Sequence, residues 1–165
     1  MPKKSQQKED ALHVLRESHR EIENLYARYR EAEGEEREEV GDALLEELEI
    51  LTAVKMELFY PGIDEEGSGA TKTFVAKAMA EQKAVRNAIE ELRSINSYDE
   101  EFDMKIETLL NDIATHHEEE ESDLFGEMEQ NKTLDLLSLG QKMLHFMREL
   151  RSVGVESTKH PGGEE

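Results

Sequence analysis

Residues 102–128 read FDMKIETLLNDIATHHEEEESDLFGEM, and this stretch indicates one long amphipathic helix. Its apolar residues recur every three or four positions, which is the period of one helix face. They are Phe102, Ile106, Leu109, Ile113, Leu124 and Met128. Between Ile113 and Leu124 the same face continues through His117 and through Glu121 or Glu120. The stretch therefore predicts a core-facing helix with an imidazole and a carboxylate on its buried side.

Three further segments repeat this period, and each has one polar residue among its apolar ones. They predict helices over residues 6–33, 35–60 and 71–95. The second helix is expected to stop at Pro61, because proline lacks the N–H that a helix interior needs. The polar residues on the three apolar faces are His19, Lys55 and Gln82. Each of the four long helices is thus predicted to turn a polar side chain inward.

Four long helices with short connections predict an all-α fold, an up-and-down antiparallel four-helix bundle. A short fifth C-terminal helix over residues 134–153 is expected to pack across one end or along the outside. The bundle is expected to occupy residues 10–153. It would follow a flexible N-terminus at residues 1–9 and precede a disordered tail at residues 154–165.

The composition limits the partners and the chemistry. The chain has 165 residues with 40 acidic and 20 basic side chains, a formal net charge of −20. A field of this sign repels nucleic acid and anionic membrane surfaces, so neither is expected as a partner. The absence of cysteine excludes disulfides and thiolate ligands. No apolar run approaches the roughly 18 residues of a membrane span, and we expect a cytoplasmic protein.

The polar residues on the apolar faces predict a shared internal site. Burying a polar group without a partner costs several kcal/mol, and burying a lone charge costs more. The side chains are therefore expected to meet at one level, where they satisfy each other or hold a small ligand or metal. His117 and Glu121 are four residues apart on one helix face and can reach a common point. Tyr26, Tyr29 and Tyr60 have core or helix-end spacing and are interpreted as packing residues.

Several segments resemble the hemerythrin-like (HHE cation-binding) family. Ser18-His19 with Ile22 and Leu25 resembles the first helix of the family. Leu139-Gly140-Gln141-Lys142-Met143 resembles its fifth helix. The second-helix likeness is Glu47-Leu48-Glu49 followed by Leu58-Phe59-Tyr60-Pro61. The fourth-helix likeness is His117-Glu118-Glu119-Glu120-Glu121 followed by Leu124-Phe125. The resemblance covers about residues 10 to 152. It implies a helical bundle related to proteins that hold a non-haem di-iron centre and bind dioxygen, or sense oxygen or iron.

Only part of the family's ligand set is present. The resemblance places its first-helix histidine at His19, and its fourth-helix histidine and carboxylate at His117 and Glu121. These three residues are the candidate metal ligands. We predict that a full di-iron centre is absent, since the other ligand positions hold different residues.

At those other positions the resemblance places apolar, amide and amine side chains. Leu51 stands at the second-helix histidine, and Lys55 stands at the bridging carboxylate four residues later. Gln82 stands at the third-helix histidine, and Ala78 at an additional one that some members have. Met56 stands where an acid is common. We take Leu51, Met56 and Gln82 as residues that line the altered site.

The first of three interpretations is a metal-free site. Lys55 would point toward Glu121 and supply positive charge where the family places a cation. His19, Gln82 and His117 would complete the cluster as hydrogen-bond partners. Exchanging a ligand carboxylate for lysine changes the local charge by two units, which directly opposes a divalent ion. This interpretation predicts no cofactor.

The alternatives remain open from the sequence. A single Fe or Zn could be held by two histidines and one carboxylate, namely His19, His117 and Glu121. Lys55 could instead be an amine nucleophile or base in an apolar pocket beside Leu51 and Met56, natural or engineered. Its amine could also turn outward while its stem packs. An interaction module that binds an unknown protein partner is a further class.

Overall fold

The computed structural model describes residues 10–96 and 98–153, and all regular secondary structure in these ranges is helical. The all-helical prediction is therefore confirmed. The termini that were predicted to be flexible, residues 1–9 and 154–165, lie outside the described residues. None of the described helices combines the length and apolar character that crossing a membrane requires.

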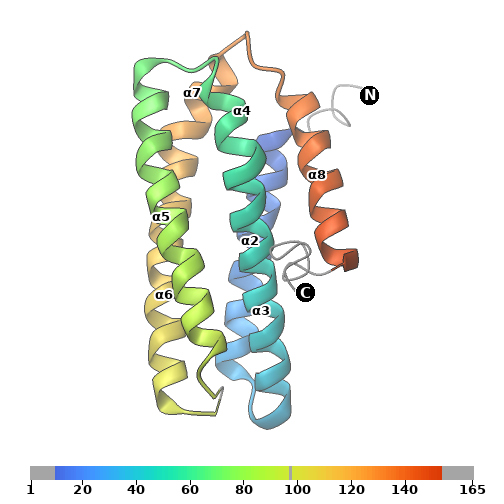
Figure 1. Cartoon of the computed structure of the whole chain (residues 1–165), viewed down its shortest axis with the longest axis vertical. Helices are drawn as coiled ribbons and strands as arrows, with labels where there is room; N and C mark the ends of the chain where they lie inside the picture. Colours follow the sequence, from blue (N-terminus) through green and yellow to red (C-terminus); the bar gives the residue numbers. More distant parts are fainter. Residues whose placement is uncertain (1–9, 97, 154–165) are drawn as a thin grey trace, which may run out of the picture.

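Long helical rods lie side by side along the long axis of the molecule (Figure 1). In chain order the elements are α2 (Ala11–Glu31), α3 (Gly34–Val54), η1 (Lys55–Phe59), α4 (Tyr60–Asp64), α5 (Gly69–Arg93), α6 (Glu100–Glu119), η2 (Glu120–Leu124), α7 (Phe125–Gln130) and α8 (Leu136–Val153). The colours in Figure 1 show that successive rods run in alternating directions. The second rod joins α3, η1 and α4, and the fourth joins α6, η2 and α7.

Local sequence signals account for the helix ends. The Asp10 carboxylate accepts a hydrogen bond from the His13 backbone N–H at 2.8 Å and caps α2. The Ser68 hydroxyl accepts one from the Thr71 N–H at 3.2 Å and caps α5. Gly34 has φ of +61°, a left-handed conformation that glycine adopts without strain, where the chain reverses from α2 into α3.

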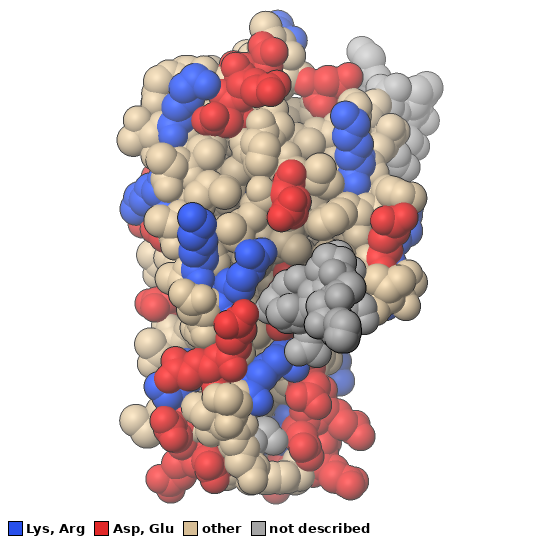
Figure 2. Space-filling view, viewed as in Figure 1, with Lys and Arg blue, Asp and Glu red and all other residues tan. Residues whose placement is uncertain are grey.

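The apolar faces of the rods meet in one continuous core, and α8 extends it. The fifth helix lies along the outside of α2 and α3, on the side of the bundle away from α5 and α6 (Figure 1). It buries Met143, Met147 and Leu150. On the face drawn in Figure 2, Asp and Glu side chains gather toward both ends of the molecule.

The second rod does not stop at Pro61, contrary to the prediction. It continues through Pro61 and Gly62 to Asp64 as α4. The five residues before α4 form a π-helical turn, η1, in which the Tyr60 N–H bonds to the Lys55 carbonyl. Pro61 then lies in the first turn of α4, where a missing N–H is tolerated.

Candidate functional site

Two π-helical turns position the charged residues of the site. The Lys55 carbonyl accepts the N–H of Tyr60, and the Glu120 carbonyl accepts the N–H of Phe125, each five residues further on. In an α-helix, residues five apart lie about 140° apart around the axis. The wider π turn lets both members of each pair face the core. Isolated π turns of this kind are frequent at functional sites.

Glu120 is the centre of the resulting cluster. Lys55 Nζ lies 2.9 Å from Glu120 Oε1 and forms an ion pair with it. The Tyr60 hydroxyl donates a short hydrogen bond to Glu120 Oε2. His19 Nε2 is 3.4 Å from Glu120 Oε1. The side chains of Lys55 and Glu120 are 1% and 2% exposed, so this ion pair is shielded from water.

Two stacked imidazoles form the second layer of the cluster. The rings of His19 and His117 lie parallel, with centroids 3.6 Å apart and an interplanar angle of 9°. The Nδ1 of His19 is 2.6 Å from Glu121 Oε2. A carboxylate accepts, so the Nδ1 of His19 donates in this contact. His19 thus lies between the buried Glu120 and the more exposed Glu121 and contacts both.

Burial and charge set the protonation of the cluster. Burial alone would raise the pKa of Glu120, but the Lys55 ammonium and His19 outweigh it and lower that pKa to about 2. Burial and the nearby Lys55 charge lower the pKa of both His19 and His117. Burial and the Glu120 charge raise the pKa of Tyr60. At neutral pH the site is a carboxylate–ammonium pair with two neutral imidazoles and a protonated phenol.

Gln82 and Leu51 lie beside this cluster. Together with His117 they line a void of about 10 Å³, which has room for no more than one water molecule. Leu51 and Gln82 are buried, and Met56 is half-buried. The structure therefore places Leu51, Gln82 and His117 side by side.

The structure also corrects one expectation about the site. Lys55 was expected to point toward Glu121, but its ion pair forms with Glu120. The Glu121 side chain is 38% exposed and touches the cluster only through His19. The physical reason is the π turn that begins at Glu120, because it turns Glu120 and Phe125 inward together. Among the described residues, no group of three or more His, Asp and Glu side chains is arranged to hold a metal ion.

The sequence interpretation missed the role of Tyr60. Its spacing predicts a packing residue, yet its hydroxyl is the hydrogen-bond donor to Glu120. The available signal is the spacing of five from Lys55 to Tyr60, with Pro61 following inside a helical pattern. That spacing fits a π turn and not an α-helical stripe.

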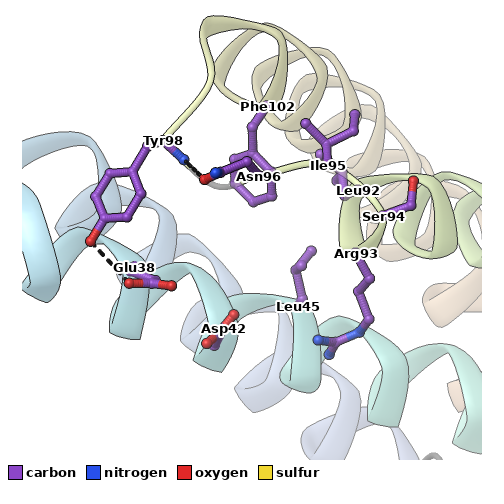
Figure 3. A pocket seen from close by; sticks show the side chains of 10 residues that line it. All are labelled: Glu38, Asp42, Leu45, Leu92, Arg93, Ser94, Ile95, Asn96, Tyr98 and Phe102. Carbon is purple, nitrogen blue, oxygen red and sulfur yellow. Dashed lines mark hydrogen bonds between the residues drawn. The ribbon is translucent and has the colours of Figure 1, made fainter.

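A separate hollow lies at the opposite end of the bundle and contains none of the predicted site residues. It measures about 550 Å³ and is bounded by α3, the end of α5 and the start of α6 (Figure 3). The Tyr98 hydroxyl donates to Glu38 Oε1 at 3.0 Å across its mouth. Leu45 and Phe102 form part of its apolar wall.

Lowering the pH below about 6.5 is expected to destabilise the fold. The folded-state pKa values of His19 and His117 lie below the ordinary 6.5, so the unfolded chain takes up protons first as the pH falls. Each buried imidazole then lowers the free energy of unfolding by up to about 2 kcal/mol at pH 5. Glu120 lowers the free energy of unfolding further in more acidic solution. Its pKa is lowered from the ordinary 4.5 to about 2, so this loss develops as the pH falls between these two values.

Urea unfolding of the protein at a series of pH values from 8 to 4 measures this effect. His117→Gln should flatten the loss between pH 7 and 5, whereas His145→Gln should not, because the His145 side chain is 73% exposed. A wild-type protein equally stable at pH 8 and pH 5 would contradict the prediction.

Comparisons with known proteins agree with the helical architecture. A sequence model described as the hemerythrin HHE cation binding domain matches residues 10–153. The structure is similar to the crystal structure of a hemerythrin HHE cation binding domain-containing protein from Mycobacterium kansasii, with a TM-score of 0.75 and 27% sequence identity. The similarity covers 93% of this chain and 94% of that one. None of the curated proteins matches the sequence.

Proposed function

Because the chain belongs to the hemerythrin HHE cation-binding domain family, we propose that it is an up-and-down four-helix bundle whose inner site works without a di-iron centre. In this proposal the Lys55 ammonium takes the place of a bound cation. The observation that carries it is the buried ion pair between Lys55 Nζ and Glu120 Oε1, 2.9 Å apart. The protein would be a metal-independent, cytoplasmic member of the family.

Electrostatics favour the ammonium over a metal. A divalent ion about 4 Å from an ammonium is repelled by about 8 kcal/mol at an effective dielectric constant of about 20. The Lys55 side chain is 1% exposed, so in this position its charge is not screened by solvent. A metal would therefore have to displace Lys55 from Glu120 before it could bind.

The donor set supports the same conclusion. The family's second-helix and third-helix histidine positions hold Leu51 and Gln82, and neither supplies an imidazole. Glu120 already contacts Lys55 and Tyr60, and the Nδ1 of His19 already contacts Glu121. The residues present do not fit a di-iron centre.

A second candidate is a mononuclear Fe or Zn site, and one observation favours it. His19 Nε2 and Glu120 Oε1 are buried, 3.4 Å apart, and without a hydrogen-bond partner among the described residues. In this alternative the ligands would be His19, His117 and Glu121, with Glu120 in reach, and Lys55 would turn away.

A nucleophilic amine at Lys55 is less compatible with the geometry. The side chain is almost fully buried and is held by Glu120. The void beside Leu51, Gln82 and His117 is too small for a carbonyl substrate. We therefore retain the metal-free site and the mononuclear site as the two candidates.

Metal analysis after expression in iron-rich and in zinc-rich medium tests the proposal. We expect far less than one metal per chain by plasma mass spectrometry, with no visible absorption and no effect of EDTA on thermal unfolding. One equivalent of metal that is lost in His117→Ala and kept in His145→Ala would support the second candidate. Two irons per chain with oxo-bridge charge-transfer bands would overturn both.

A further inference from the structure

A second large hollow runs between α5 and α6, on the side of the bundle away from α8. It measures about 650 Å³. Its apolar floor is made by Val85, Ala88 and Leu92 of α5 and by Leu109 of α6. Met104, which is 68% exposed, stands at its edge and is one of few large apolar side chains that the described residues expose. The groove is thus an open apolar channel between two rods.

The rim of this groove is strongly acidic. Its acidic lining residues are Glu81, Glu91, Glu100, Glu101 and Asp112. Lys105 also lines the groove, and its Nζ is paired with Glu91 at 2.8 Å. Glu100 and Asp112 form no ion pair with another described residue under the usual 4 Å limit. An apolar floor between negative edges has the chemistry to bind an apolar stripe flanked by cations.

We propose that this groove binds a basic amphipathic helix of a partner protein. Along α5 the lining extends from Glu81 to Leu92, which corresponds to about 16 Å or three helical turns. A helix of that length can insert apolar residues spaced three and four apart while its Lys and Arg side chains reach the acidic rim. Met104 suits such a role, because a flexible thioether adapts to different apolar partners.

The bundle already contains one helix, α8, that packs along a pair of rods. α8 lies along α2 and α3 and buries Met143, Met147 and Leu150 against them. The pair α5 and α6 has no covering helix among the described residues. A second copy of this chain is a poor occupant, because with a net charge of −20 its surface would be repelled by the acidic rim.

Fluorescence anisotropy with the full-length protein tests the proposal. The probe is a labelled helical peptide of about four turns, with leucines on one face and lysines on both flanks. We expect binding in the micromolar range that weakens with added salt. A peptide with the same leucines and with glutamates in place of the lysines should not bind.

Two groove variants and two matched controls locate the site. Met104→Arg and Glu101→Lys should each weaken peptide binding by about tenfold or more. Val153→Arg exchanges another exposed apolar residue, and Glu36→Lys makes the same charge change on α3; both should bind as wild type does. All four positions are exposed, so folding should be retained.

Several outcomes would overturn the proposal. These are the absence of binding in the micromolar range, equal binding of the glutamate peptide, and equal binding by Met104→Arg and wild type. A concentration-dependent dimer that Met104→Arg abolishes would identify a second copy as the occupant and would also overturn it. Light scattering distinguishes that case.

Discussion

Lys55→Met is expected to lower the free energy of unfolding by about 3–5 kcal/mol. The substitution keeps most of the apolar stem and removes the ammonium that lies 2.9 Å from Glu120. Glu120 is 2% exposed, so its carboxylate would be left buried with only Tyr60 and His19 as partners. An uncompensated buried charge is among the costliest changes that a single substitution produces.

Urea unfolding at pH 7.5 measures the effect. Lys77→Met is the matched control, because Lys77 is also paired with carboxylates, Glu81 and Glu119, but its side chain is 65% exposed. Exposed pairs of that kind contribute about 0–1 kcal/mol. The double variant Lys55→Met/Glu120→Gln should recover most of the loss, since the amide still accepts from Tyr60 without a charge. If Lys55→Met does not fold but the double variant does, the loss of folding is due to the uncompensated charge of Glu120. A loss below about 1 kcal/mol would show that the ion pair does not stabilise the core.

The helices could be predicted because their burial follows the α-helical period. Along α6 the predicted stripe of Phe102, Ile106, Leu109 and Ile113 is buried in the structure. The α2–α3 turn was also predictable, because Gly34 is a residue that tolerates the left-handed conformation found there. The family likeness was carried by the same segments, and it extends over residues 10–153.

The arrangement of the site was less predictable, because two π turns break that period. Within the run Glu118 to Glu121 neighbouring positions differ by about 100° around a helix axis but have identical side chains. Only the local backbone decides which acid faces inward. The α-helical period favoured Glu121, whereas the π turn buries Glu120. For the same reason the role of Tyr60 was not predicted, because Tyr60 faces the site only as a result of the π turn η1 before it.

Lys55→Glu is expected to make the stability of the protein depend on a divalent metal. The exchange changes the local charge by two units and places a carboxylate beside Glu120, Glu121 and the two imidazoles. Without metal, these like charges should destabilise the fold at least as much as Lys55→Met does. With Zn²⁺ or Fe²⁺, the same groups become ligands of the types that these ions prefer. Ligand at one hundred times its dissociation constant would then add about 2.7 kcal/mol of stability.

Thermal unfolding of Lys55→Glu in EDTA and in added Zn²⁺ or Fe²⁺ measures this dependence. The metal should raise the unfolding midpoint of the variant strongly and leave the wild type unchanged, since the ammonium of Lys55 opposes a cation there. Lys83→Glu makes the same charge change at an exposed position of α5 and should show no metal response. Adding His117→Gln to Lys55→Glu should abolish the gain, because it removes an imidazole ligand. An equal response of wild type and variant would mean that the ammonium does not keep metal out, and no response of the variant would mean that the remaining donors cannot converge on an ion.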